Sequence, residues 1–472
     1  MNGRTTIYTA LDDLTLDNVI EEVESALLIH SQDVSEMNYL YWYHRGNQPI
    51  LKREKQIRPD ICNKIVENHA KEIVSFKNSW FLTQPIFYVP RHEEGTDKAK
   101  TLNEFIYRSG KAIADNKTVN WFHIVGKGIE YIEQRNDPVA PFKVYSIDPR
   151  NAFVVYSLSP SHEPVYSVNM AINGDDVIYD VFTKTRRFKL KGANNISHNE
   201  PISTFTVTQI LPFNSELSVY EIPNPLGEIP MVEFFADSTH MGSFEAVMPL
   251  IDAINEIESN RVDSIAQFVQ SLVVATNVEF PEGTTASAIN ESGLLSIKSI
   301  GQNQASIEIL SQQLGQSETQ VFVDYLYEQI LNLCAMPSTT KGGTSTSDTG
   351  AAVLARDGYT QADMAAQNTE DCWRESNEYV DRIIQAIINV NTKFEIDIKD
   401  FELQFTRNET ANIQSKAQAC STMLGMGMHP VLAFTKSGIS NDAVADVEMS
   451  KPYLDQKQEY AQKEVAEDDV AV

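Results

Sequence analysis

The residues that could do chemistry in this chain form no common catalytic motif. Two glycine clusters that could cradle a phosphate, around Lys127 and at Gly342-Gly343, lack the spacing GxxxxGK[ST] of a nucleotide-binding loop. None of the nine histidines forms HExxH or another close metal-binding pair, and no GxSxG sequence marks a nucleophilic serine. The sequence therefore predicts no enzyme, no resident metal ion and no cofactor.

One short segment has a composition suited to contacting an anion. Residues 337–349 (PSTTKGGTSTSDT) contain proline, glycine, serine and threonine besides one cation, Lys341, and one anion, Asp348. Such residues favour turns and an adaptable backbone, and a lysine ammonium can contact phosphate without reading bases. A plain surface loop between two helices is the alternative interpretation. The candidate contact residues of this loop are Thr340, Lys341, Gly342, Gly343, Thr344 and Ser345.

Two helical patterns flank this loop. Residues 317–334 repeat apolar side chains at helical intervals after Ser317, a suitable N-cap, and the pattern stops at Pro337. From about residue 348 the chain is predicted to be helical to Val390, which corresponds to about 60 Å at about 1.5 Å per residue. A single small core does not need so long a helix, so we expect the loop to be carried at the end of a rod.

A third helical pattern, over residues 243–276, is strongly acidic on its polar surface. Arg261 is the one basic residue on it. Its acidic residues are Glu245, Asp252, Glu256, Glu258 and Asp263. Short β-like pieces in residues 277–310 separate this helix from the one that begins near Ser317. The two helices are therefore predicted to flank a small mixed module.

The rest of the chain predicts the α+β class. Helices are expected at 14–45, in two pieces, and at 60–75 and 101–121, before a series of β-like stretches separated by turn signals. This order favours a mainly antiparallel sheet. Residues 394–407 alternate apolar and polar side chains and could rejoin the N-terminal sheet, and the chain ends in an acidic tail.

The charge balance argues against a protein that grips nucleic acid. The chain has 38 basic and 65 acidic residues and a formal net charge of −27. Tight binding to phosphates requires a basic face, which this composition does not provide. An acidic wall would suit a conduit along which DNA slides, and ordinary solubility is the alternative explanation.

Cysteine usage and hydropathy predict a protein made inside a cell without a membrane anchor. The four cysteines are far apart and lie in helical patterns, which favours buried thiols over disulfides. No apolar run reaches the length of about 18 residues that a membrane span needs, and the N-terminus lacks the pattern of a signal peptide.

The order of these elements, with several local strings, resembles the portal proteins of tailed bacteriophages of the long non-contractile-tailed type. The strings are YLYWYHRGNQPIL at 39–51, NKIVEN at 63–68 leading to WFLTQP at 80–85, and GEIPMVEF at 227–234 followed by FEAVMPLIDAINEIESNRVDSI at 244–265. Each string is moderately specific. The order of helix, module, helix, loop and rod along the chain is the more specific part of the resemblance.

The resemblance implies a portal fold with seven parts. These are an α/β wing (1–242), a first stem helix (243–276), a small α/β clip (277–310), a second stem helix (311–336), a tunnel loop (337–349), a long tunnel helix with a returning wing strand (350–407), and a helical crown with an acidic tail (408–472). Repeated around a ring, the acidic stem face would repel phosphate and keep DNA mobile. Family members often place basic residues near the tunnel, where this chain has only Lys341.

The resemblance also implies partners and a location. The expected assembly is a homo-oligomeric ring, usually of twelve copies, at one vertex of the virion capsid, through which double-stranded DNA is packaged and ejected. The large terminase and the head-tail adaptor proteins would bind the clip, and the major capsid and scaffolding proteins are further partners. The clip residues expected to bind partners are Glu279, Pro281, Glu282 and Lys298. Synthesis would take place in the host bacterial cytoplasm.

Two alternatives fit part of the sequence. An enzyme with a helical lid, formed by the loop at Gly342, would be monomeric and would show hydrolase activity. Another tail or baseplate structural protein would also be oligomeric and acidic. Such proteins are usually richer in β structure and lack paired long helices around a small module.

Overall fold

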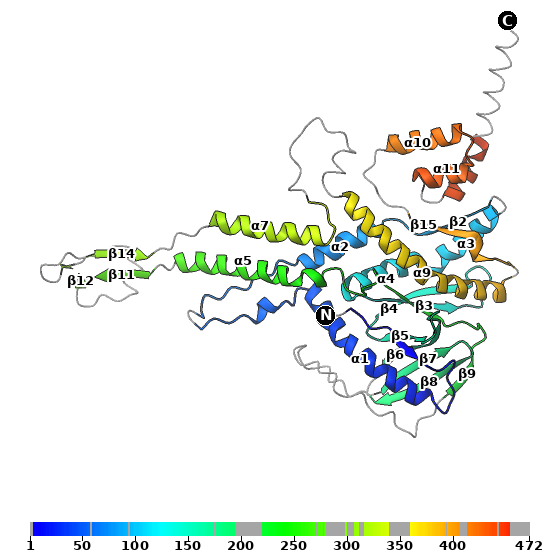
Figure 1. Cartoon of the computed structure of the whole chain (residues 1–472), viewed down its shortest axis with the longest axis horizontal. Helices are drawn as coiled ribbons and strands as arrows, with labels where there is room; N and C mark the ends of the chain where they lie inside the picture. The colour runs from blue at the N-terminus through cyan, green and yellow to red at the C-terminus, as the bar shows by residue number, and fades with distance from the viewer. Residues whose placement is uncertain are drawn as a thin grey trace, which may run out of the picture. The chain divides into compact units, whose positions relative to one another are not determined.

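The computed structural model has a mixed α+β fold that divides into two compact units (Figure 1). Unit 1 comprises Met1–Arg45, Asn68–Met248 and Leu331–Val472, and unit 2 comprises Gly46–Glu67 and Pro249–Ile330. The structure describes residues 3–56, 59–92, 95–173, 176–193, 220–269, 272–276, 278–279, 298–299, 306–310, 316–338, 359–392, 394–405, 413–440 and 443–453. No helix within these ranges is long and apolar enough to cross a membrane.

The largest sheet of unit 1 has six strands in the order β1-β5-β6-β7-β8-β9. They are β1 Ile7–Thr9, β5 Ala152–Ser157, β6 Pro164–Asn173, β7 Asp176–Thr183, β8 Arg186–Ala193 and β9 Tyr220–Pro223. β1 pairs in parallel with β5, and the other neighbours are antiparallel. Helix α1, Val19–His44, packs Val23 and Leu27 against sheet residues that include Phe153, so its apolar stripe is covered by the sheet.

A second layer of unit 1 contains a three-stranded sheet, with its strands in the order β10-β3-β4, and three helices. Its strands are β3 Gly128–Gln134, β4 Phe142–Ile147 and β10 Met231–Phe234. The helices of this layer are α2 His69–Phe81, α3 Thr96–Ser109 and α4 Lys111–Val125. Gly110 separates α3 from α4 with a φ of +75°, a left-handed conformation that ends one helix and lets the next begin.

Helix α9, Tyr359–Asn391, supplies the centre of the unit 1 core. Trp373 is fully buried, and its ring centroid lies 4.3 Å from that of Phe234, 5.9 Å from that of Phe81 and 6.2 Å from that of Phe122. The Lys111 ammonium lies 5.5 Å from the same indole ring. These contacts fix the rotation of α9 about its axis, because one large side chain occupies a pocket built by α2, α4 and β10.

Buried ionic groups tie the same elements together. Lys127 donates to Glu233 over 3.0 Å, and the backbone N–H of Val154 donates to the same carboxylate over 3.1 Å. Lys111 of α4 pairs with Asp115 of the same helix at 2.6 Å and lies 3.6 Å from the carboxylate of Glu130 on β3. Breaking such a pair leaves an uncompensated charge, so these contacts specify how the two sheets and α4 meet.

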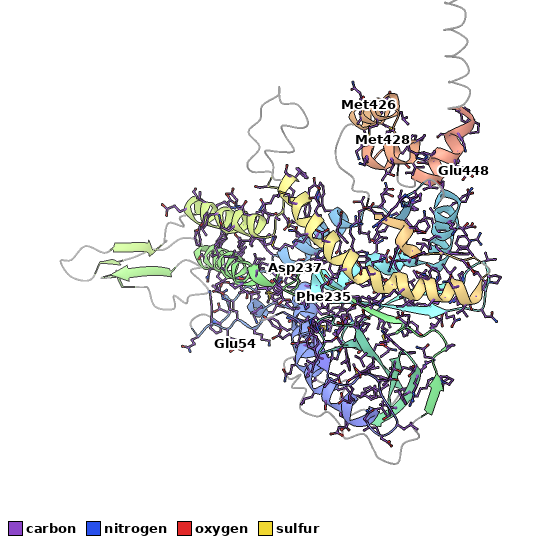
Figure 2. All side chains as sticks on the ribbon, turned by 45° about the vertical axis from the view of Figure 1, so that its right-hand side comes forward. Glu54, Phe235, Asp237, Met426, Met428 and Glu448 are labelled. Carbon is purple, nitrogen blue, oxygen red and sulfur yellow. The ribbon has the colours of Figure 1, made fainter. Side chains whose placement is uncertain are left out.

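The chain returns to the N-terminal part of unit 1 after α9. A short helix η6, Ile398–Asp400, leads into β15, Phe401–Gln404, which pairs antiparallel with β2, Phe87–Pro90. Residues 401–404 of the segment 394–407 thus form a strand as expected, but they pair with β2 in a two-stranded sheet instead of rejoining the larger N-terminal sheet. Helices α10, Ile413–Gly425, and α11, Pro430–Ser437, follow, and in the helical residues 443–453 Glu448 pairs with Lys100 of α3 (Figure 2).

The described part of unit 2 contains two long helices, two small ladders and a basic N-terminal segment. Helix α5, Met248–Val269, follows the short helix η4, Glu245–Val247, and helix α7 spans Gln316–Leu333. Between them, β11 Leu272–Thr276 pairs antiparallel with β14 Ser306–Leu310, and β12 Val278–Glu279 with β13 Lys298–Ser299. The basic segment is residues 46–67, which contain the short helix η1, Pro49–Lys52.

Several predicted element bounds are wrong. Residues 19–44 form one helix rather than two pieces, and the helix expected at 60–75 begins only at His69. The acidic helix ends at Val269 rather than near Thr276, because Leu272–Thr276 (LVVAT) is rich in β-branched residues and pairs with β14. The long helix after the loop is described from Tyr359 onward, and its expected start near residue 348 lies outside the described residues.

Candidate functional site

The candidate loop residues lie outside the part of the chain that the structure describes. This holds for Thr340, Lys341, Gly342, Gly343, Thr344 and Ser345, and for Pro281 and Glu282 of the predicted clip. The two remaining clip residues lie in the ladder of β12 and β13, where Glu279 is directly opposite Lys298. The chain therefore brings these two positions together across an antiparallel pair, although they are far apart in sequence.

The five predicted acidic residues fall into two groups. Glu245 belongs to unit 1, where it is buried, accepts from the backbone N–H of Gly242 over 2.5 Å and pairs with Arg4 at 3.3 Å. Arg4 is itself buried, so Glu245 neutralises a cation at the start of the chain. The other four residues, Asp252, Glu256, Glu258 and Asp263, lie on α5 in unit 2.

A row of buried polar side chains on α5 was not predicted. Asn255, Ser259 and Asp263 are four residues apart, which places them on one face of the helix, and each exposes at most 3% of its surface. They accept hydrogen bonds from alternate backbone N–H groups of the basic segment: Glu67 to Asn255 at 2.7 Å, Ile65 to Ser259 at 2.9 Å, and Asn63 to Asp263 at 2.7 Å. We call Asn255, Ser259 and Asp263 the polar row.

The match between helix and extended chain explains this arrangement. Four residues of α-helix advance about 6 Å, and two residues of extended chain advance about 6.6 Å, so successive pairs stay in register. The segment from Asn63 to Glu67 therefore runs antiparallel to α5 without a strand partner. Its backbone donors are satisfied by helix side chains, which is why this stretch is extended although its apolar spacing suggested a helix.

Asp263 is the most connected residue of the polar row. Its carboxylate also accepts from the Asn63 amide at 2.8 Å, from Arg53 at 2.8 Å and from Lys55. Burial acts to raise the pKa of Asp263, but the hydrogen bonds from Lys55, Asn63 and Arg53 outweigh burial and lower the pKa to about 2. Asp263 therefore stays ionised and anchors the basic segment to α5.

The two acidic residues on the more exposed part of α5 also have cationic partners. Glu256 is exposed and lies 3.3 Å from the Arg53 guanidinium, and Glu258 pairs with Arg261 at 2.5 Å. Arg261 donates onward to Gln320 of α7 over 2.9 Å, which links the two helices of unit 2. Exposed carboxylates gain little from such pairs, so Glu256, whose side chain is 51% exposed, remains available to an approaching charged ligand. The side chains of Glu258 and Arg261 are only 16% and 23% exposed.

The charges of unit 2 are unevenly divided. Residues 249–330 contain eleven acidic and two basic side chains, whereas the basic segment 46–67 contains five basic and three acidic ones. A protein surface of one sign repels ligands of that sign over roughly a Debye length, about 8–10 Å at physiological salt. The α5–α7 pair can therefore act as an acidic wall, while Arg53 and Lys55 neutralise Asp263 and Arg53 also lies beside Glu256.

One comparison decides the family. The family model described as phage portal protein, SPP1 Gp6-like, matches residues 26–468, which is nearly the whole chain. The chain belongs to this family of phage portal proteins. No curated protein matches this sequence.

As a phage portal protein, the chain is a structural component of the virion capsid. Portal proteins form an oligomeric ring through which the phage genome is packaged and released, with the capsid, the terminase and DNA as partners. The resemblance seen in the sequence is thereby confirmed, and neither a lid-bearing enzyme nor a tail or baseplate protein is favoured.

The polar row was missed because its members are common residues in an apolar helical pattern. The usable signal was an Asn, a Ser and an Asp repeated every four residues inside α5, at positions where helix interiors rarely place them. A second signal was the basic character of residues 46–67, which lie far in sequence from the acidic helix α5. Together these signals would have suggested that the two segments of this portal protein meet.

Proposed function

We propose that unit 2 of this portal protein forms the wall of the DNA channel in a ring of twelve copies. In this proposal α5 and α7 are the two stem helices, residues 277–310 are the clip, 337–349 are the tunnel loop, and α9 is the part of the tunnel helix that follows it. The observation that carries the proposal is the order within unit 2: a helix, an antiparallel module built on β11 and β14, and a second helix.

The electrostatics of unit 2 support the same proposal. DNA carries about one negative charge per 1.7 Å of its axis, so an acidic wall repeated around a ring repels it from every side. Asp252, Glu256 and Glu258 are the stem acids proposed to face DNA. Glu245 and Asp263 contribute to the same negative field, while their carboxylates hold Arg4 and the basic segment.

The surface of α7 supports a ring in which copies pack side by side. Val321, Phe322 and Tyr325 expose 69%, 51% and 54% of their surfaces. A monomer in water gains nothing from exposing three large apolar side chains on two turns of helix, and a neighbouring copy would cover them. The proposal assigns this face of α7 to contact between stems.

The proposed clip faces the partners that bind in turn. The large terminase would engage it during packaging and the head-tail adaptors afterwards, with Glu279, Pro281, Glu282 and Lys298 as contact residues. The pairing of Glu279 with Lys298 across β12 and β13 supports a common location for these two residues. The capsid and scaffolding proteins would contact other faces, and the ring would assemble in the host cytoplasm.

The role of Lys341 in the tunnel loop can be tested directly. Lys341→Glu adds a negative charge to every copy at the proposed constriction, and we expect it to lower the amount of DNA packaged by at least about threefold through repulsion of phosphate. Rings should assemble normally, because the contact between copies is proposed on α7 and not on this loop. The measurement is nuclease-protected DNA in reconstituted capsids.

A matched variant sharpens this test. Lys341→Arg keeps the positive charge and should package as the original protein does. Equal packaging by the Glu and Arg variants, with rings intact by electron microscopy, would remove Lys341 from the proposed function.

A further inference from the structure

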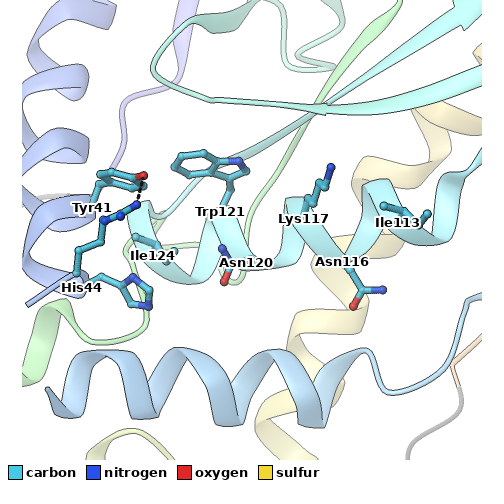
Figure 3. A pocket seen from close by; sticks show the side chains of 9 residues that line it. Tyr41, His44, Ile113, Asn116, Lys117, Asn120, Trp121 and Ile124 are labelled. Atoms are coloured by element: carbon cyan, nitrogen blue, oxygen red, sulfur yellow. Dashed lines mark hydrogen bonds between the residues drawn. The ribbon is translucent and has the colours of Figure 1, made fainter.

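Unit 1 has a groove whose lining residues have no role in the function proposed above. It has a volume of about 640 Å³ and lies at the C-terminal end of α1, along α4 (Figure 3). Tyr41 of α1 stacks on Trp121 of α4 at 5.7 Å with an interplanar angle of 23°. Arg45 donates to the Tyr41 hydroxyl over 2.9 Å, and Lys117 and Ile113 extend the groove along α4.

The groove is positively charged in an acidic chain. Among the described residues, neither Arg45 nor Lys117 makes an ion pair with a carboxylate. His44, which also lines the groove, stays neutral because burial, with Lys71 and Arg45 nearby, lowers its pKa to about 4. The groove thus offers two cations beside an aromatic stack and an exposed isoleucine, a surface suited to an acidic helix with some apolar content.

Helix α9 carries a matching acidic surface on the same unit. Asp371, Glu375 and Glu378 are exposed and lie on one side of the helix at spacings of four and three residues. In the described part of the chain none of the three makes an ion pair, since Arg374 donates to the carbonyl of Leu403 and Arg382 pairs with Glu163. We call these three residues the acidic stripe.

The groove and the acidic stripe cannot meet within one copy. Phe122 of α4 and Trp373 of α9 face each other in the core, with ring centroids 6.2 Å apart. At about 100° per residue, Lys117 lies about 140° around α4 from Phe122, and Glu375 lies about 160° around α9 from Trp373. The two surfaces therefore point away from each other, on opposite sides of the α4–α9 pair.

Opposed complementary surfaces are what a closed ring needs. In a cyclic oligomer each contact is heterologous, so one face of a copy meets a different face of its neighbour. We propose that the groove at Tyr41 and Trp121 receives the acidic stripe of the neighbouring copy, with Arg45 and Lys117 opposite Glu375 and its helix neighbours. The ring itself comes from family membership, and this contact adds where and by which charges adjacent copies meet.

The contact can be tested by exchanging the charges between copies. Lys117→Glu places a carboxylate opposite Glu375, and Glu375→Lys places an ammonium opposite Lys117. Like charges at an interface oppose association, so we expect each variant alone to need at least about tenfold more protein than the original chain for half-maximal ring formation. Lys98→Glu on α3, an exposed lysine away from the groove, is the matched control and should assemble normally.

Mixing the two variants gives the most specific outcome. When copies of Lys117→Glu and Glu375→Lys alternate, every interface again pairs a lysine with a glutamate, so an equimolar mixture should recover rings that contain both chains in equal number. Native mass spectrometry measures this composition directly. The same recovery of rings is expected for Arg45→Glu mixed with Glu378→Lys. This second pair shows whether the result depends on a defect in one particular variant.

The possible results of these experiments distinguish a wrong assignment of this contact from a failure of ring formation in general. Failure of the unmodified chain to form rings would overturn the oligomer rather than the contact. Rings of each single variant that form as readily as those of Lys98→Glu would overturn the contact. Variants that fold, by an unchanged circular dichroism spectrum, yet fail to recover on mixing would also overturn it.

Discussion

Replacing Trp373 by alanine is expected to lower the free energy of unfolding of unit 1 by about 3–5 kcal/mol. The side chain is fully buried, and it is the one that Phe81, Phe122 and Phe234 surround. Its removal leaves a cavity among rings that cannot collapse, and it frees the rotation of α9. The measurement is chemical denaturation of the full chain, monitored by near-ultraviolet circular dichroism.

Two matched variants make this result specific. Trp373→Phe keeps most of the volume and removes an indole N–H that has no hydrogen-bond partner among the described residues, so we expect a loss of only about 1 kcal/mol. Tyr107→Ala removes an aromatic side chain that is 85% exposed and should change little. A loss below about 1 kcal/mol for Trp373→Ala would contradict the assignment of Trp373 as the centre of the core.

Replacing Asp263 by alanine is expected to release the basic segment from α5. The substitution removes the carboxylate that Arg53 and Lys55 both contact, and it leaves the Asn63 backbone N–H without its hydrogen-bond acceptor. We expect a cost of about 3 kcal/mol to unit 2, because one partner of a buried ionic cluster is removed while the others remain. Trypsin should then cleave after Arg53 and Lys55 at least about tenfold faster than in the original chain, which limited proteolysis with mass spectrometry measures.

The pH dependence of this contact follows from the pKa of Asp263. That pKa lies at about 2 in the folded chain, below the ordinary value of 3.8, so the folded state favours the ionised form. The stabilisation, about 2 kcal/mol, is therefore fully present above pH 4 and is lost as the pH falls from about 4 to about 2. Asp263→Ala should lack this acid-dependent loss.

A neighbouring acid provides the control. Glu256→Ala removes an exposed carboxylate that lies 3.3 Å from the same arginine, and exposed pairs contribute about 1 kcal/mol or less. Its trypsin sensitivity should match that of the original chain. Equal sensitivity of the Asp263 and Glu256 variants would mean that the polar row does not hold the basic segment.

Sequence periodicity predicted the elements that are stabilised by their own apolar face. Helix α9 is an example, since Trp373, Val380, Ile383 and Ile387 recur on one side and are all buried. The strand at residues 401–404 was also foreseeable from its alternation of apolar and polar side chains, although its partner β2 was not. The α+β class follows from these elements and their order.

Periodicity failed where distant residues decide the local conformation. Ile61 and Ile65 have helical spacing, yet the polar row of α5, nearly 200 residues away, captures the backbone N–H groups of that stretch. At Leu272–Thr276 the helix gives way to a strand because β14 offers a ladder, which a single-segment pattern does not reveal. In both places a tertiary contact outweighs the intrinsic helix or strand preference of the residues, because that preference is small for each residue.

The candidate site was foreseeable in its charge and not in its geometry. The sequence shows that residues 243–276 are acidic, but the partners of these acids come from elsewhere: Arg4 for Glu245, and Arg53 and Lys55 for Asp263. The groove at Tyr41 and Trp121 was equally hidden, because α1 and α4 supply its two aromatic rings from positions 80 residues apart. Charge counts along a sequence do not reveal which charges are already paired.

The central claim, that this chain forms a ring whose channel is walled by unit 2, is most directly tested by cryo-electron microscopy of the purified full chain. The account predicts a closed ring of about twelve copies, with Asp252, Glu256 and Glu258 toward the lumen and residues 337–349 at its narrowest point. A chain that remains monomeric at high concentration, or a ring in which α5 faces outward, would contradict it.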